Sequence, residues 1–292
     1  MSTLETNSIG KYSGDNVAID DSLNLKSYST SGRNALTSVA GDIIYNSDDN
    51  KIQFYNGSSW EDTATPTFSA DFLIIAGGGG GGASAQAPLG MGGGGAGGLL
   101  ASYNNENTGG GGSSLDSITI IADGTTTYPV TIGAGGTGYS SGSAAGGIGN
   151  VGNKSQFVLL ASGGAPPIYR YASNADHIGG SGAGGATSNN TGSHGLPGEG
   201  YNGGSGVNYT GNTSAGSGGG GGAGGDGTNA SGGTAGNGGA GLASTITGTS
   251  VVYAGGGGGG GGTGGGTAGT GGGGAGGVNA AGSNGSPNTG GG

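Results

Sequence analysis

Val251-Val252-Tyr253-Ala254 leads directly into Gly255–Gly262, and this order of a short apolar run, one alanine and unbroken glycine decides how the chain folds. The same order occurs at Phe72-Leu73-Ile74-Ile75-Ala76 and, before a shorter glycine pair, at Phe157-Val158-Leu159-Leu160-Ala161. Short runs of β-branched and aromatic residues are typical of strands. A recurring strand–alanine–glycine order is hard to obtain in a random coil, so we expect the glycine to be structured.

Glycine accounts for 86 of the 292 residues. Collagen is excluded, because there are only seven prolines and no strict Gly-X-Y period. We expect the glycine runs to form polyglycine-II helices, which have three residues per turn and exchange backbone hydrogen bonds with their neighbours. Besides Gly255–Gly262, the uninterrupted runs are Gly77–Gly82, Gly92–Gly95, Gly109–Gly112 and Gly218–Gly222.

The composition changes near residue 70, which predicts an N-terminal β module over residues 1–70 and a glycine-rich domain over residues 71–292. The N-terminal part contains a predicted hairpin, Asp42–Tyr45 with Lys51–Tyr55, and a second turn at Asn56-Gly57. An isolated hairpin is marginally stable in water, so this module is expected to attach or oligomerise. The expected fold class is mostly non-regular plus β: a short hairpin module, then packed polyglycine-II helices with short strands.

A further hairpin is predicted from Ser117–Ile121 to Thr125–Ile132, with Asp123-Gly124 as its turn. Asp-Gly between β-rich runs is among the strongest short-range turn signals. Pro129 cannot donate a hydrogen bond to a neighbouring strand, so its strand is expected at a sheet edge or a bulge.

Composition and motifs also exclude several classes of function. The net charge of −10 argues against nucleic acid as a partner, and no apolar stretch is long enough to predict membrane insertion. His177 and His194 lack helical spacing and cysteine partners, so no metal site is expected. No nucleophile motif accompanies them, and matches to G-x-G-x-x-G are inevitable at this glycine content. We therefore expect no catalytic residues, no cofactor and no enzymatic activity.

We expect receptor recognition in the segments between the glycine runs, where residues with large side chains are concentrated. Tyrosine and asparagine combine flat contact area with hydrogen bonding at low entropic cost. The alternative is that the tyrosines cover the glycine segments or are buried between subunits. The candidate receptor contacts are Tyr169, Arg170, Tyr171, Asn174, Tyr201 and Tyr209.

Several segments resemble structural proteins of phages. Met1–Ile9 looks like the start of tail-fibre-like proteins of marine phages, and Gly41–Asn46 with Phe54–Trp60 is similar to a strand-turn-strand element of phage fibre and collar proteins. Phe72–Gly77, Gly92–Gly98 and Tyr128–Gly136 resemble a glycine-rich domain of phage fibre proteins, in the style of phage tip adhesins with polyglycine-II helices.

The resemblance implies a virion protein of a tail fibre or appendage that faces the host. Its implied partners are copies of itself, as a homotrimer, other tail or fibre proteins, and a host cell-surface glycan or protein. No export signal is evident at Met1, so release by lysis is expected. The alternatives are a purely structural decoration or connector protein without receptor binding, and an ice-binding glycine-rich protein.

Overall fold

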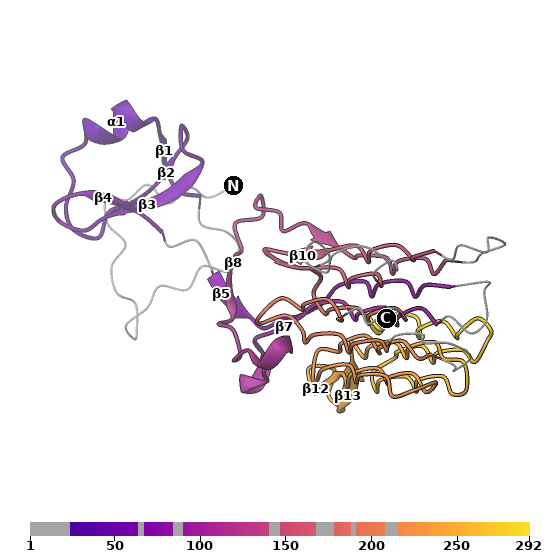
Figure 1. The fold of residues 1–292 in the computed structure, drawn as a ribbon. Coiled ribbons are helices and arrows are strands. Elements are labelled where there is room, and N and C mark those ends of the chain that lie inside the picture. Colours follow the sequence, from indigo (N-terminus) through magenta and orange to yellow (C-terminus); the bar gives the residue numbers. More distant parts are fainter. Residues whose placement is uncertain are drawn as a thin grey trace. The chain divides into compact units, whose positions relative to one another are not determined.

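A computed structural model describes residues 24–63, 67–83, 90–139, 147–167, 178–187, 191–207 and 215–292. The chain divides into two compact units, Met1–Pro66 (unit 1) and Thr67–Gly292 (unit 2), and Figure 1 shows their elements. Within the described ranges, helix is limited to α1 (Thr30–Asn34) and two 3-10 turns, and the remaining regular structure is short β-strands. This confirms the expectation of a mostly non-regular fold with β-strands. No described helix is long and apolar enough to span a membrane.

Unit 1 contains a four-stranded sheet in the order β1-β2-β3-β4. The first pair is parallel and the other two are antiparallel. The predicted hairpin is confirmed as β2 and β3, and Gly57, with a φ of 100°, allows the tight turn that leads into β4. The strands are β1 (Ser27–Tyr28), β2 (Ile43–Asn46), β3 (Lys51–Tyr55) and β4 (Trp60–Asp62).

The two faces of the β2–β3 hairpin have opposite characters. On one face Ile44 is buried next to Asn46 and Gln53, which are themselves only 0% and 3% exposed. On the other face Ile43 and Phe54 form a cross-strand pair whose side chains are 54% and 38% exposed. The interior of unit 1 is therefore largely polar, and an apolar sheet face remains in contact with solvent.

The described residues of unit 2 form four small sheets, whose labelled strands gather towards one end of long extended segments that run side by side (Figure 1). β5 (Thr67–Ala70) pairs with β8 (Ile118–Ile121), and β6 (Leu73–Ile75) with β7 (Leu99–Ala101). β9 (Val130–Thr131), β10 (Ser155–Phe157) and β11 (Leu159–Ala161) form the third sheet, and β12 (Leu242–Ser244) pairs with β13 (Val251–Tyr253).

The division between the units falls at Pro66, before the boundary expected at residue 70. The difference is strand β5, whose partner β8 lies about fifty residues further along the chain, in unit 2. This long-range pairing joins Thr67–Ala70 to unit 2, although its composition resembles the N-terminal part.

The predicted hairpin between Ser117–Ile121 and Thr125–Ile132 is wrong. Asp123-Gly124 does form a turn, with a φ of 74° at Gly124, but the flanking strands do not pair with each other. β8 pairs with β5 and β9 pairs with β10. The Tyr128 hydroxyl accepts the N–H of Ile121 at 2.7 Å, and Pro129 has no N–H to continue a ladder, so the strands separate after the turn.

Two further segments differ from the expected local structure. Phe157–Ala161 was expected to be one strand, but Val158 adopts a φ of 58° and turns the chain, so that β10 and β11 pair antiparallel. Gly109–Gly111 forms a 3-10 turn with positive φ at Gly110 and Gly111, unlike the other long glycine runs.

The alanines that close the apolar runs are all buried. Ala76, Ala161 and Ala254 are at most 1% exposed. Ala254 belongs to a cluster with Leu99 and Ala223, and the other two pack with Phe72 and Ile74 in a second cluster. The strand–alanine–glycine order therefore marks the places where a glycine segment leaves a small apolar core.

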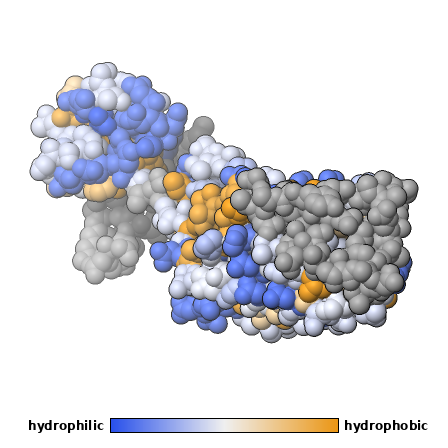
Figure 2. Space-filling view, viewed as in Figure 1, coloured by the Kyte–Doolittle hydropathy of each residue, from blue (hydrophilic) through white to orange (hydrophobic). Residues whose placement is uncertain are grey.

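Apolar side chains are also exposed on unit 2. Figure 2 shows hydrophobic residues gathered near its strand-bearing end, while much of the remaining coloured surface of this unit is near neutral. The large apolar side chains exposed on β5, β8 to β11 and their turns include Phe68, Ile121, Val130, Ile132, Val158 and Leu160.

The extended glycine segments are joined by backbone hydrogen bonds that repeat every three residues. Along segment 217–223, consecutive N–H groups donate in turn to three different neighbouring segments. The N–H groups of residues that are three apart donate to the same neighbouring segment. The pairs are Ser217, Gly220 and Ala223 with Gly260, Gly257 and Ala254; Gly218 and Gly221 with Gly185 and Gly182; and Gly219 and Gly222 with Thr228 and Gly225.

The carbonyl groups of the same segment accept hydrogen bonds with the same three-residue repeat. Those of residues 216, 219 and 222 accept from residues 207, 204 and 201, those of 217 and 220 from 236 and 239, and those of 218 and 221 from 93 and 96. Three segments accept from segment 216–222 and three donate to it, so it has six hydrogen-bonded neighbours. Gly255–Gly261 repeats the pattern, since residues 255, 258 and 261 donate to residues 271, 274 and 277.

The neighbouring backbones approach so closely that a side chain would not fit at many of these glycines. A Cβ atom added to Gly93, Gly220 or Gly256 would lie closer than 3.0 Å to a carbonyl oxygen of the adjacent segment. Buried serines are accommodated where their hydroxyls find carbonyl partners. Ser217 Oγ, for example, lies 2.6 Å from the Met91 oxygen and 2.7 Å from the Gly260 oxygen.

Gly80 and Gly81 provide a matched test of this packing. A Cβ atom at Gly80 would collide with the carbonyl of Thr137, whereas one at Gly81 has no atom within 4 Å. We expect Gly80→Ala to lower the free energy of unfolding by about 1–3 kcal/mol through overpacking. Gly81→Ala should be neutral or stabilising by up to about 1 kcal/mol, because it restricts the unfolded chain. Urea unfolding of both variants measures this, and equal losses would contradict the packing argument.

The Asp123 turn gives a prediction for pH. The Thr126 hydroxyl and N–H and the Thr125 N–H donate to the Asp123 carboxylate and hold its pKa well below the ordinary value of 3.8. Because the folded-state pKa is depressed, the turn's stabilisation is present above the unfolded pKa of about 3.9 and is lost as pH falls through the folded one. NMR titration should show that Thr126→Val raises this pKa, while Thr127→Val leaves it unchanged.

Candidate functional site

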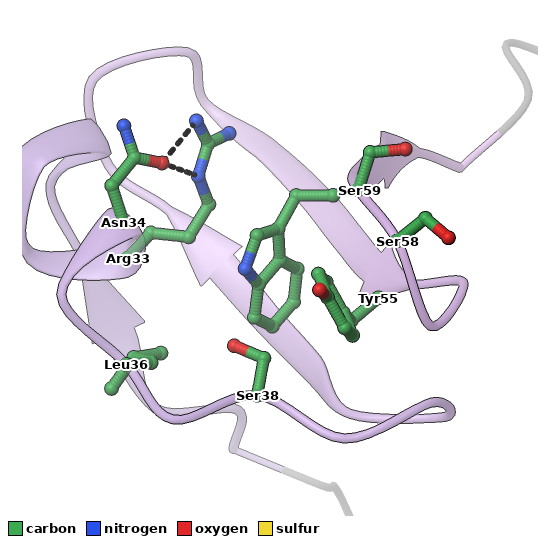
Figure 3. A pocket seen from close by; sticks show the side chains of 8 residues that line it. Arg33, Asn34, Leu36, Ser38, Tyr55, Ser58 and Ser59 are labelled. Atoms are coloured by element: carbon green, nitrogen blue, oxygen red, sulfur yellow. Dashed lines mark hydrogen bonds between the residues drawn. The ribbon is translucent and has the colours of Figure 1, made fainter.

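A pocket of about 430 Å³ lies on unit 1 between α1, the loop that follows it and the β3–β4 turn (Figure 3). It is open to solvent and combines aromatic, cationic, amide and hydroxyl groups. We call it the Trp60 pocket. Its lining residues are Arg33, Asn34, Leu36, Ser38, Tyr55, Ser58, Ser59 and Trp60.

Two aromatic rings form part of the wall of the pocket. Tyr55 ends β3 and Trp60 begins β4, and the two residues are direct cross-strand partners. Their ring centroids lie 5.5 Å apart with an angle of 54° between the planes. Aromatic cross-strand pairs of this kind stabilise a sheet, and both rings are half-buried, so each keeps part of its surface accessible.

The turn between these rings is fixed by Asn56. Its side-chain oxygen accepts the N–H groups of Ser58 and Ser59 at 2.8 and 2.9 Å, and its own N–H donates to the Ser59 carbonyl at 3.0 Å. Asparagine is favoured in turns because it makes such local bonds. The Ser59 hydroxyl donates to Glu61 at 2.7 Å, whereas Ser58 is exposed at the rim.

Arg33 is held by three hydrogen bonds. Its Nε and Nη2 donate to Asn34 Oδ1 at 3.0 and 2.9 Å, as Figure 3 shows, and Nη1 donates to Gln53 Oε1 at 2.7 Å. A guanidinium group carries five N–H donors in a planar fork. Three are used here, which leaves two to meet a ligand from a fixed position.

A polar network behind the pocket supports Arg33. Gln53 Nε2 donates to Asp62 Oδ1 at 2.6 Å, and Lys51 Nζ lies 2.6 Å from Asp62 Oδ2. The hydrogen bond from Gln53, followed by that from Lys51, lowers the pKa of Asp62, and the hydrogen bond to Asp62 raises the pKa of Lys51. Buried Asn46 also donates to Gln53 Oε1, at 3.1 Å. A satisfied network of this kind gives its members a defined geometry.

Ser38 adds a hydroxyl that points into the pocket (Figure 3). Its Oγ is buried and has no hydrogen-bond partner among the described residues. A buried polar atom without a partner costs free energy unless water or a ligand satisfies it. A second depression of about 280 Å³ shares Leu36 and Trp60 with this pocket, and there Lys26 Nζ lies 5.2 Å from the centre of the Tyr28 ring.

Most of the receptor contacts expected from the sequence lie outside the described residues. These are Tyr169, Arg170, Tyr171, Asn174 and Tyr209, and their role stays a prediction. His177 lies outside as well. In the described part of the chain, no three His, Cys, Asp or Glu side chains come together as a metal site.

Tyr201 is described, and its backbone is part of the glycine packing. Its N–H donates to the Gly222 carbonyl and its carbonyl accepts from Gly182. Its side chain is half-buried, and a Cβ atom at Gly111 would lie 3.0 Å from its hydroxyl. The ring therefore borders the Gly109–Gly111 turn, which leaves a contact role and a covering role both open.

Comparison with known families identifies a glycine-rich domain in the chain. The family model of the glycine-rich domain matches residues 56–292. The chain belongs to this glycine-rich domain family. The match covers all of unit 2 and begins at Asn56 in the β3–β4 turn. No curated protein and no solved structure matches the chain.

The Trp60 pocket is not among the sites expected from the sequence. Trp60 is expected only as part of a strand-turn-strand element, and Arg33 has no expected role. Trp60 is the single tryptophan of the chain, and it lies five residues after Tyr55 across an Asn-Gly turn. That spacing places two aromatic residues side by side at the turn end of a hairpin, and this is the signal in the sequence that indicates the pocket.

Gln53 tests whether the polar network holds unit 1 together. Gln53→Ala removes the shared hydrogen-bond partner of Arg33, Asn46 and Asp62. We therefore expect the free energy of unfolding of unit 1 to fall by about 1–3 kcal/mol. Trp60 fluorescence during urea unfolding reports on this unit. Ser47→Ala, in the exposed β2–β3 turn of the same unit, is the control and should change stability by less than about 0.5 kcal/mol. A neutral Gln53→Ala would refute the role of the network.

Proposed function

We propose that this chain is a virion structural protein of a phage tail fibre or appendage, and that its glycine-rich domain is a polyglycine-II lattice that displays loops for host recognition. The observation that carries the proposal is the three-residue repeat of hydrogen bonds between glycine segments. A protein whose backbone is cross-linked in several directions is suited to a rigid scaffold. Membership of the glycine-rich domain family agrees with the resemblance to phage fibre proteins.

Two observations favour polyglycine-II geometry. N–H groups that change partner at each residue and return after three fit a helix with three residues per turn. None of the glycines in Gly218–Gly222 or Gly255–Gly262 has a positive φ, as a uniform left-handed extended helix requires.

Self-assembly through unit 1 is part of the proposal. Ile43, Ile52 and Phe54 share one face of the β2–β3 hairpin and are 54%, 42% and 38% exposed. Contiguous apolar surface of this kind is favourable to bury against another chain. A homotrimer that also contacts other tail or fibre proteins would place unit 1 at the attachment end, with a host cell-surface glycan or protein as the target of the displayed loops.

The function is proposed to be binding and support, without enzymatic activity. A decoration or connector protein that binds no receptor is the second candidate, because the same rigid lattice serves it equally well. Ice binding would require a flat, regular array of threonines, and a test for thermal hysteresis is expected to be negative.

Hydrogen exchange tests the lattice. The amides of Gly218–Gly222 each donate to another segment, so they should exchange orders of magnitude more slowly than the amide of Gly124 in the exposed Asp123 turn. Equal, fast exchange at both places would contradict a packed lattice.

Two further measurements test the biological role. Immunogold labelling with an antibody against unit 2 should decorate the fibres or appendages of intact particles, and labelled full-length protein should bind host cells saturably. Label on particles without saturable binding would favour the decoration or connector alternative. The absence of label from particles would refute a virion role.

A further inference from the structure

We propose that the Trp60 pocket binds one neutral pyranose ring of a saccharide. This site lies in unit 1, outside the glycine-rich packing, and does not depend on the function proposed above. A volume of about 430 Å³ lies within the range of about 300–1,000 Å³ found for small-molecule sites.

The chemistry of the wall matches the two sides of a sugar ring. A pyranose presents C–H groups on its faces and hydroxyl groups around its edge. The negatively charged face of an aromatic ring attracts weakly positive C–H groups, and Tyr55 and Trp60 offer two such faces, 5.5 Å apart and tilted by 54°. Stacking on either ring would turn the hydroxyl edge of the sugar towards the polar side of the pocket.

That polar side carries both donors and acceptors. Arg33 has two N–H groups beyond the three used within the protein. The Asn34 side-chain nitrogen makes no hydrogen bond within the described ranges, and the Ser58 hydroxyl is exposed at the rim. The buried hydroxyl of Ser38 lacks a partner that a sugar hydroxyl or a bridging water would supply.

The site is also organised before a ligand arrives. Gln53 and Asn34 fix the guanidinium of Arg33, and Asn56 fixes the turn that carries Ser58 and Ser59. Side chains that are already ordered lose little entropy on binding, which raises affinity. A single sugar ring nevertheless makes few contacts, so a dissociation constant near the millimolar range is expected, and repeated copies in an assembly would strengthen binding.

Charge and lining composition narrow the ligand class. Among the eight lining residues Arg33 alone is charged, and Glu61 accepts a hydrogen bond from Ser59 of the lining, so the local charge is balanced and a neutral sugar is favoured over a uronic acid. Proline-rich peptides also bind between aromatic rings, but they use grooves lined mainly by aromatic side chains. Of the eight lining residues here only Leu36, Tyr55 and Trp60 are apolar or aromatic, which favours a polyhydroxylated ligand.

The single tryptophan makes the test direct. In a ¹⁵N-labelled full-length chain, Trp60 gives the only indole N–H signal. Glucose, galactose, mannose, rhamnose and N-acetylglucosamine are each added up to the high millimolar range, with glucuronic acid and a proline-rich decapeptide as comparisons. We expect at least one neutral sugar to shift the indole signal saturably, and glucuronic acid to bind more weakly than glucose.

A pair of serine variants separates binding in the pocket from a general effect. Ser58→Ala removes a hydroxyl at the rim, and Ser47→Ala removes one from the exposed β2–β3 turn outside the pocket. Loss of one hydrogen bond should weaken sugar binding by roughly two- to tenfold for Ser58→Ala, with no change for Ser47→Ala. The proposal is overturned if no neutral sugar shifts the signal, if both variants behave alike, or if only the peptide binds.

Discussion

The absence of Cβ atoms is the constraint on which unit 2 depends. At many glycines the space that a side chain would occupy is filled by a carbonyl oxygen of the next segment. Parallel and antiparallel neighbours can therefore surround one backbone, as six do around segment 216–222. In a β-sheet the hydrogen bonds of a strand lie in one plane and join two neighbours, whereas here they leave the segment in several directions. The backbone itself replaces the side-chain core of an ordinary domain.

This arrangement has a narrow margin of stability. Ordering one residue costs about 1–2 kcal/mol, and glycine loses the most freedom, while one hydrogen bond contributes a net of about 0.5–1.5 kcal/mol. Hydrogen bonds alone thus come close to balancing the entropy. The two apolar clusters add burial, and they do so where Ala76, Ala161 and Ala254 enter the glycine segments. The short strands fix the starting points of the extended segments, and buried Ser217 keeps its hydroxyl hydrogen-bonded to the backbone.

The sequence predicted the elements better than their partners. The β2–β3 hairpin was predictable because its turn and both strands are adjacent in the chain. The hairpin predicted over Ser117–Ile132 is absent because β8 pairs with Thr67–Ala70, which lies far away in the chain. Local turn chemistry carries no information about such a distant partner. The positive φ of Val158 was also not predictable from the sequence, since β-branched residues rarely adopt such a conformation. In the candidate site, Trp60 and Arg33 meet only after the hairpin and α1 have packed, so neither residue type alone indicated a pocket.

The long-range character of the glycine pairing has a consequence for how the chain reaches its native state. Gly93 and Ala96 pair with Gly218 and Gly221, and the Gly97 N–H donates to the carbonyl of Gly290, which is much further along the chain. Folding slows as the mean sequence separation of contacts grows, because the entropy of closing long loops is lost before the contacts can stabilise the chain. Isolated glycine segments have no intrinsic preference that would begin the process. Unit 2 should therefore fold slowly, through a nucleus of apolar strands. Once the hydrogen bonds between its segments have formed, it should also unfold slowly.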